Sequence, residues 1–179
     1  MPNRTSPRPK AARKPKATDP KIVKLPKQKM AVVVSHGDPN VVGAKVFPAL
    51  YGAVYTQKFA LKKAGKETFK VGPPAHLVPK DQWTGIWGLP IPANTRTLPQ
   101  PDPEVLVRIE TWDYGGTVAE VLHIGPYSEE EPTIQRLHEF IAASGYEIAG
   151  VHEEEYLTTP KAKVQKTIIR YPVKKRKKG

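Results

Sequence analysis

The residues best suited to carry out chemistry lie in one short segment near the C-terminus, His-Glu-Glu-Glu-Tyr at 152–156. Side chains of a β-strand alternate between two faces, so a strand here places His152, Glu154 and Tyr156 together. The other face carries Val151, Glu153, Glu155 and Leu157. One face must contact the interior, and either choice takes at least one carboxylate with it. Periodicity alone does not choose between Glu154 and Glu155.

A carboxylate inside a protein is costly unless it has a partner. Its pKa rises, or it acquires a cationic neighbour or a hydrogen-bond network. Strongly perturbed titrating groups gather at functional sites, so the segment indicates a binding or catalytic site. The alternative is an edge strand whose three glutamates all lie in water.

Charge is distributed very unevenly along the 179 residues, which contain 29 Lys plus Arg and 17 Asp plus Glu. Residues 1–29 hold ten bases and one acid, and residues 174–178 are all basic. Subtracting these fifteen bases and one acid leaves 14 bases and 16 acids in residues 30–173. We therefore expect one folded domain over 30–173, with a disordered Pro- and Lys-rich tail over 1–29 and a basic tail over 174–179.

The two basic tails at 1–29 and 174–179 attract polyanions, so non-specific nucleic acid is an expected partner. A purely solubilising tail is the alternative. No apolar run approaches the length of a membrane span or a secretory signal, so we expect no membrane association. The absence of cysteine excludes disulfides and thiol chemistry and suggests a reducing, cytoplasmic location. His36 and His152 are too scattered to predict a metal site, and no cofactor is expected.

Apolar periodicity predicts the same order of elements in both halves of the domain. The first half has predicted strands at 30–35, 69–71 and 83–89, with a helix over 43–63. The second half has predicted strands at 105–111, 118–124, 147–157 and 163–172. Its helix carries Ile134, Leu137 and Ile141, and Ser128 with Glu131 has the spacing of a capping box.

The repeated order strand, helix, strand, strand predicts an α+β fold. Two pseudo-symmetric modules would form an antiparallel sheet, or a pair of sheets, with two helices on one face and a ligand cleft on the other.

Several motifs resemble the GyrI-like small-molecule-binding family, which includes effector domains of multidrug-sensing transcription regulators and free-standing bacterial proteins. They are H-I-G-P-Y at 123–127, E-E-P-T-I at 130–134, E-x-Y-L at 154–157 and K-T-I-I-R-Y-P-V at 166–173. In the first half, G-D-P-N at 37–40, A-L-Y-G-A-V-Y-T-Q-K-F at 49–59 and Gly-Ile-Trp at 85–87 resemble a free-standing branch. Together these motifs cover most of residues 30–173.

The resemblance implies a cleft between the two modules with an acidic residue at its centre, which the E-x-Y-L spacing places at Glu154. His152 and Tyr156 would line the same cleft. Glu155 stands where the family usually has an apolar residue, and Glu153 stands where this branch often has a histidine. Thr84 and Gly88, which flank Trp87, replace a glutamate and a second tryptophan of the branch.

Aromatic residues near the predicted ends of the cleft supply its walls. Tyr51 and Tyr55 lie four apart on the first helix and share one side of it, although core packing explains Tyr51 equally well. A strand histidine bonded within the protein is the simpler interpretation of His123. The candidate ligand-binding residues are Tyr51, Tyr55, Trp87, Trp112, His123 and Tyr127.

Aromatic walls around one carboxylate suit a flat, lipophilic and often cationic ligand. The resemblance also implies an alternative, since free-standing members include hydrolases that open the cyclopropane of DNA-alkylating compounds. Glu154 would then orient or deprotonate water, while Tyr156 or His152 donates to the carbonyl that gains charge. In a third hypothesis, the basic tails hold such a protein near DNA.

Overall fold

The computed structural model describes residues 16–79 and 83–177. These residues contain nine strands and two α-helices. The first half contains β1 (Lys21–Lys24), β2 (Gln28–His36), α1 (Pro39–Lys63), β3 (Ala75–Val78) and β4 (Thr84–Pro90). The second half contains β5 (Arg108–Trp112), β6 (Thr117–Ile124), the 3₁₀ turn η1 (Tyr127–Glu129), α2 (Glu131–Ala143), β7 (Tyr146–Ile148), β8 (His152–Tyr156) and β9 (Lys166–Lys175).

The strands form one antiparallel sheet in the order β1-β6-β9-β8-β3-β4-β2-β5, with β7 pairing to the end of β9. This arrangement confirms the predicted α+β fold and its two modules, β2-α1-β3-β4 and β6-α2-β8-β9. In each module the second of the three named strands lies innermost, so β3 and β8 pair at the centre of the sheet. Glu154 of β8 lies directly opposite His76 of β3 in that pair.

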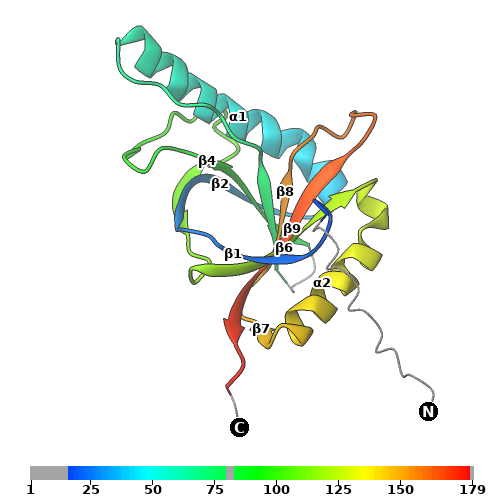
Figure 1. Cartoon of the computed structure of the whole chain (residues 1–179). Coiled ribbons are helices and arrows are strands. Elements are labelled where there is room, and N and C mark those ends of the chain that lie inside the picture. The colour runs from blue at the N-terminus through cyan, green and yellow to red at the C-terminus, as the bar shows by residue number, and fades with distance from the viewer. Residues whose placement is uncertain (1–15, 80–82, 178–179) are drawn as a thin grey trace, which may run out of the picture.

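The two helices cover separate parts of the sheet, α1 across the top of Figure 1 and α2 at its lower right. Leu50 and Val54 of α1 pack into a core that includes Val33 and Trp87. Leu137 and Ile141 of α2 pack against Ile169. A third cluster, which includes Val32 and Ala75, lies on the other side of the sheet.

The strand register places Glu154 on the helix-packed side of the sheet. Glu154 pairs with His76 on one side and with Ile169 on the other, and His76 pairs with Trp87. We call the face with Val33, His76, Trp87, Glu154 and Ile169 the helix face, and the face with Val32, Ala75, Glu153, Glu155 and Arg170 the opposite face. The residues beside Glu154 thus belong to helix-packed rows of the sheet.

Several predicted elements have different bounds in the structure. α1 begins at Pro39 rather than at residue 43. The strand expected at 69–71 is absent from the described residues, and β3 forms at 75–78 inside the proline-rich connection. The strand expected over 147–157 is divided into β7 and β8, because the register against β9 shifts by two residues between Ile148↔Val173 and Glu153↔Arg170.

The predicted capping box is also wrong. Ser128 lies in η1, and the residue before α2 is Glu130, whose side chain makes no capping hydrogen bond.

The N-terminal tail is shorter than predicted. β1 lies within 1–29 and pairs with β6 from Lys21↔Glu120 to Lys24↔Thr117. Ile22 and Val23 pack against the clusters on the two sides of the sheet, which explains why so polar a segment forms an edge strand. At the other end β9 continues to Lys175. The remaining tail residues, 1–15 and 178–179, lie outside the described residues. Among the described helices, none is long and apolar enough to cross a membrane.

Candidate functional site

Glu154 is the centre of a polar cluster at the junction of the two modules. Tyr156 donates its hydroxyl hydrogen to Oε2 of Glu154 at 2.7 Å, and Nε2 of His152 lies 3.1 Å from Oε1. The Glu154 side chain is only 16% exposed. In the described part of the chain, no Lys or Arg forms an ion pair with it. The carboxylate is thus buried and held by groups that do not require a permanent positive charge.

The surroundings of Glu154 favour its ionised form. Burial raises the pKa of Glu154, but hydrogen bonds from His152 and Tyr156 outweigh burial and hold this pKa below its ordinary value. Burial, followed by the charge of Glu154, raises the pKa of Tyr156, so its hydroxyl keeps its proton and remains a donor. The site therefore presents a negative charge at neutral pH.

Two histidines connect this cluster to the sheet around it. Nδ1 of His152 lies 2.8 Å from the Tyr171 hydroxyl, and Nδ1 of His76 lies 3.3 Å from the Tyr156 hydroxyl. Burial lowers the pKa of His76 to about 4, so its ring is neutral. The His76 ring stacks on Trp87, with centroids 3.8 Å apart and planes within 2°.

Most of the predicted aromatic residues lie on the helix face. Tyr127 meets the Tyr156 ring edge-on at 5.3 Å, and Trp87 donates its indole hydrogen to Ser35 at 2.8 Å. Tyr51 and Tyr55 stack along α1 with centroids 6.2 Å apart. Tyr51 packs against the same core cluster as Tyr156, and Tyr55 is 39% exposed.

Two predicted site residues have other surroundings. Trp112 is buried on the opposite face in the cluster that includes Tyr114 and Val118. His123 contacts the hydroxyl of Thr133 at 3.0 Å and the carbonyl of Pro126 at 3.1 Å. These contacts connect β6 to the start of α2 and match the interpretation of His123 as a bonded strand histidine.

Glu130 is a site residue that the sequence analysis missed. It precedes α2 and is only 5% exposed. Burial and then the charge of Glu154 raise the pKa of Glu130 to about 7, and a hydrogen bond with Thr167 opposes the shift. Glu130 in turn raises the pKa values of Tyr127 and Tyr156. Its position in the E-E-P-T-I motif could have indicated a site residue. The motif lies in a run of three consecutive glutamates, however, and the sequence does not show which of their side chains turns inward.

The other glutamates of β8 meet a cation on the opposite face. Arg170 contacts Glu120 at 2.9 Å and Glu153 at 2.8 Å, and it also pairs with Glu155. Burial lowers the pKa of Arg170, but its three carboxylates outweigh burial and raise it. This ion-pair cluster gives the physical reason for a glutamate at position 155, where the family usually has an apolar residue.

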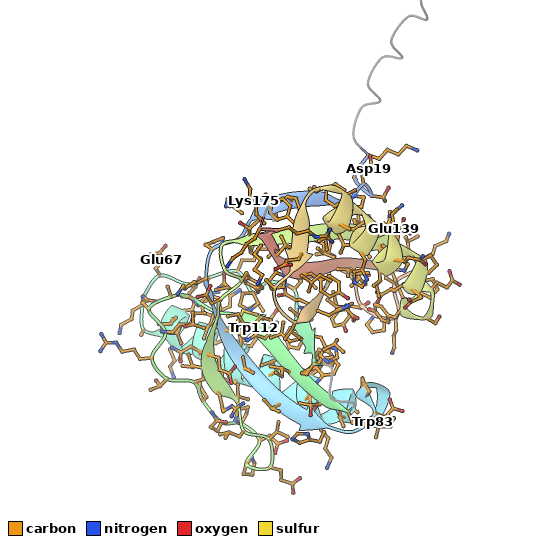
Figure 2. All side chains as sticks on the ribbon, turned by 90° about the horizontal axis from the view of Figure 1, so that it is seen from below. Asp19, Glu67, Trp83, Trp112, Glu139 and Lys175 are labelled. Carbon is orange, nitrogen blue, oxygen red and sulfur yellow. The ribbon has the colours of Figure 1, made fainter. Side chains whose placement is uncertain are left out.

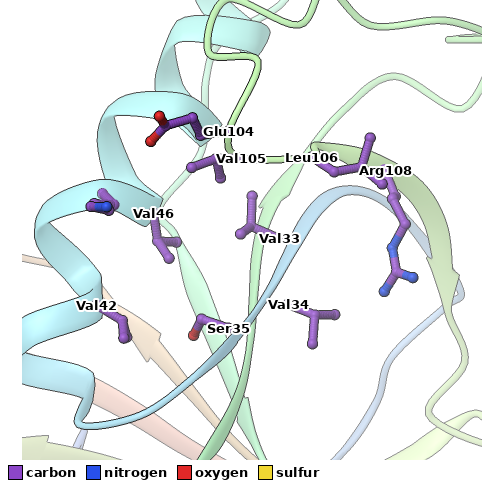
Figure 3. Close-up of a pocket in the computed structure, with 10 residues that line it drawn as sticks. Val33, Val34, Ser35, Val42, Val46, Glu104, Val105, Leu106 and Arg108 are labelled. Atoms are coloured by element: carbon purple, nitrogen blue, oxygen red, sulfur yellow. The ribbon is translucent and has the colours of Figure 1, made fainter.

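Two pockets border the helix face. One of about 410 Å³ lies between β2, α1 and the segment before β5, where Val33, Val46 and Val105 line it (Figure 3). The other, of about 230 Å³, is lined by His76, Trp87 and Trp83. Figure 2 shows Trp83 at the edge of the molecule and Trp112 among packed side chains. Within the described ranges, no group of three His, Asp or Glu side chains is arranged to hold a metal ion.

Comparison with protein families gives one match, and it covers most of the chain. The model for the GyrI-like small molecule binding domain matches residues 18–174. A comparison with curated proteins finds no match.

Solved structures share the fold. A hydrolase from Listeria innocua superimposes with a TM-score of 0.76 at 23% identity, covering 90% of this chain and 94% of that protein. An uncharacterized conserved protein from the same organism gives a TM-score of 0.76 at 25% identity, with 88% and 93% coverage. The C-terminal domain of EcmrR gives a TM-score of 0.54 at 14% identity, with 88% and 98% coverage.

Proposed function

This chain belongs to the GyrI-like small-molecule-binding family, and on that premise we propose that it binds lipophilic, planar aromatic cations beside Glu154. One observation supports this function above the others: Glu154 is buried, its pKa is held low, and no Lys or Arg of the described residues pairs with it. A negative charge in such a place is stabilised most by a positive charge that arrives with a ligand.

The neighbouring rings suit the apolar part of such a ligand. Tyr127 and Tyr156 meet edge-on beside the carboxylate, and Tyr55 offers a half-exposed ring on α1. Aromatic faces attract cations as well as apolar surface, so rings and carboxylate favour the same class of compound. Binding of this kind would sequester xenobiotic compounds.

Isothermal titration with ethidium, a planar aromatic cation, tests the proposal. We expect Glu154→Gln to weaken ethidium binding about tenfold or more, because the substitution removes the charge but keeps a hydrogen-bond acceptor for Tyr156. Phenanthridine, the neutral parent ring, should bind both proteins with similar affinity. Glu129→Gln makes the same change of charge at an exposed position and serves as the matched control. Equal ethidium affinities for wild type and Glu154→Gln would contradict the proposal.

A second candidate function is hydrolysis of a cyclopropanoid alkylating compound in the same place. The specific support is the pair Glu154 and Glu130, whose pKa values move in opposite directions. Carboxyl pairs of this kind divide the roles of base and acid. Glu154 would accept a proton from water as the water oxygen attacks the ring carbon, and the strained carbon–carbon bond would break. The electron pair passes to the conjugated carbonyl, whose oxygen takes a proton that Glu130 or Tyr156 supplies.

Mass spectrometry distinguishes binding from hydrolysis. The full-length protein is incubated with a cyclopropanoid alkylator, and the intact and water-added species are followed with time. The hydrolase hypothesis expects turnover that Glu154→Gln abolishes and Glu129→Gln leaves intact. Saturable binding without a water-added product would leave the protein as a sequestering module.

A further inference from the structure

The pocket of about 230 Å³ has His76 in its lining but not Tyr156. The end of β2, the start of α1, β3 and the start of β4 enclose it, and its lining is mostly apolar. Lining side chains used below are those of Val42, His76, Val78, Trp83 and Trp87.

A buried acceptor faces this pocket. His76 is 5% exposed, and its Nε2 atom has no hydrogen-bond partner. Nε2 points toward Gly85, which also lines the pocket: a Cβ at Gly85 would lie 3.0 Å from Nε2 of His76 and 2.6 Å from Nε1 of Trp87. Nε2 is buried in the pocket wall, and glycine at position 85 keeps a side chain out of the space beside it.

The hydrogen-bond network determines which nitrogen of His76 carries the proton. Tyr156 donates its hydroxyl hydrogen to Glu154, so the Tyr156 oxygen acts as acceptor toward Nδ1 of His76. Nδ1 must then hold the hydrogen of the neutral ring, since a neutral imidazole has one N–H. Nε2 is left with a lone pair, and burying a lone pair without a donor is unfavourable.

The rim of the pocket is held in a strained conformation. Trp83 has φ of +82°, which is rare for a bulky residue, and its side chain is 61% exposed. Its carbonyl accepts a hydrogen bond from the Gly37 N–H at 2.8 Å, and this bond fixes the conformation. Backbone strain of this kind persists mainly at functional sites.

We propose that this pocket is a second binding site, for a small neutral aromatic ring that carries one N–H or O–H group donated to Nε2 of His76. Phenols and indoles belong to this class. The Trp87 and Trp83 rings supply apolar area, and the ligand donor satisfies the buried acceptor. Binding here needs no positive charge on the ligand, so the inference does not depend on the proposed cation site at Glu154.

Indole and benzothiophene provide a matched pair of probes, because sulfur replaces the N–H in a ring of nearly the same shape. Ligand titrations followed by NMR of the full-length protein should show indole binding about tenfold more tightly than benzothiophene. Equal affinities for the two probes, or no saturable binding of indole, would overturn the proposal.

Substitution at His76 tests the role of the acceptor. The side-chain amide of His76→Asn occupies the place of Nδ1 and still donates to Tyr156, but it has no atom at the place of Nε2. The preference for indole should fall to within about twofold in His76→Asn. A preference that stays at tenfold would show that Nε2 is not the acceptor.

Two further measurements separate this inference from the cation site. Saturating ethidium should leave the indole preference of the wild-type protein in place, and saturating indole should leave its ethidium affinity within about threefold. If His76→Asn fails to fold, nitrogen NMR of the wild-type protein still shows which ring nitrogen of His76 carries the hydrogen. We expect the hydrogen on Nδ1. A hydrogen on Nε2 would overturn the proposal.

Discussion

The two faces of β8 hold their glutamates in different ways. On the opposite face, Glu153 and Glu155 both pair with the guanidinium of Arg170. On the helix face, Glu154 is held by the Tyr156 hydroxyl and the His152 ring. The first two carboxylates share a permanent cation of the protein with Glu120. Glu154 is stabilised by a tyrosine and a histidine rather than by an arginine, and this difference distinguishes the two faces.

Exposure does not explain the difference between the faces. The Glu153 side chain is 2% exposed, while those of Glu154 and Glu155 are 16% and 21% exposed. Glu154 thus lies between its neighbours in exposure and differs from both in the charge of its partner. Buried carboxylates are normally paired with Lys or Arg, so a carboxylate held by a tyrosine and a histidine calls for a functional explanation.

Removing the cation of the opposite face should have the largest effect on stability. Arg170→Met leaves three carboxylates without their shared partner, and we expect the free energy of unfolding to fall by about 3–5 kcal/mol. Urea unfolding followed by circular dichroism measures the change. Replacing Glu153 and Glu155 by leucine in the same variant should restore part of the loss. A loss below about 1 kcal/mol would show that the faces do not differ as described.

Neutralising the carboxylate of the helix face should have a much smaller effect on folding. Glu154→Gln removes a buried charge but keeps an acceptor for Tyr156, so the free energy of unfolding should stay within about 1 kcal/mol of wild type or rise. The same urea experiment measures it beside Arg170→Met. A loss as large as that of Arg170→Met would assign Glu154 a structural role.

Cation affinity should depend on pH through Glu130. Its pKa of about 7 means that raising the pH from 6 to 8 adds a second negative charge near Glu154. Ethidium affinity should therefore rise about threefold to tenfold over this range, as measured by titration calorimetry, and Glu130→Gln should flatten the profile. An unchanged pH profile in Glu130→Gln would exclude Glu130 as the titrating group.

The same group has an opposite effect on stability. Folding raises the pKa of Glu130 above its ordinary value of 4.5, so the folded state favours the protonated form. Its contribution to stability is fully present below pH 4.5 and is lost as the pH rises through about 7. The free energy of unfolding of wild type should thus decrease across this window relative to that of Glu130→Gln.

The N-terminal extension should affect neither face. Residues 1–15 contain five basic residues and no acid, and β1 begins only at Lys21. Deleting 1–15 should leave ethidium affinity and the free energy of unfolding unchanged, while DNA binding at low salt weakens. Gel-shift titrations at two salt concentrations measure the DNA affinity of the full-length and shortened proteins. Equal DNA binding by both proteins would leave the tail a solubilising role only.

Much of the fold and the central acid were predictable from local pattern and family resemblance. Two strand–helix–strand–strand modules follow from apolar periodicity, and the E-x-Y-L spacing selected Glu154. The partner of Glu155 was not predictable in this way, because Arg170 meets Glu120 and Glu153 only through the register of β6, β9 and β8. Register between distant strands is a tertiary property.

Two site residues escaped the sequence analysis for related reasons. His76 lies in a short strand between prolines, where turn residues masked the strand pattern. Glu130 precedes α2 in a run of acids that looked like a helix start, and only packing shows that its side chain turns inward. Both residues acquire their chemistry from burial, which a single sequence does not report.

Carboxyl-carbon NMR of the three β8 glutamates, recorded while ethidium is titrated into the wild-type protein, tests the difference between the faces most directly. The account predicts that the Glu154 resonance shifts in proportion to ethidium bound, while those of Glu153 and Glu155 stay in place because these residues lie on the opposite face and are already paired with Arg170. Saturable binding that leaves the Glu154 resonance unmoved, or that moves the resonance of Glu155 instead, would contradict it.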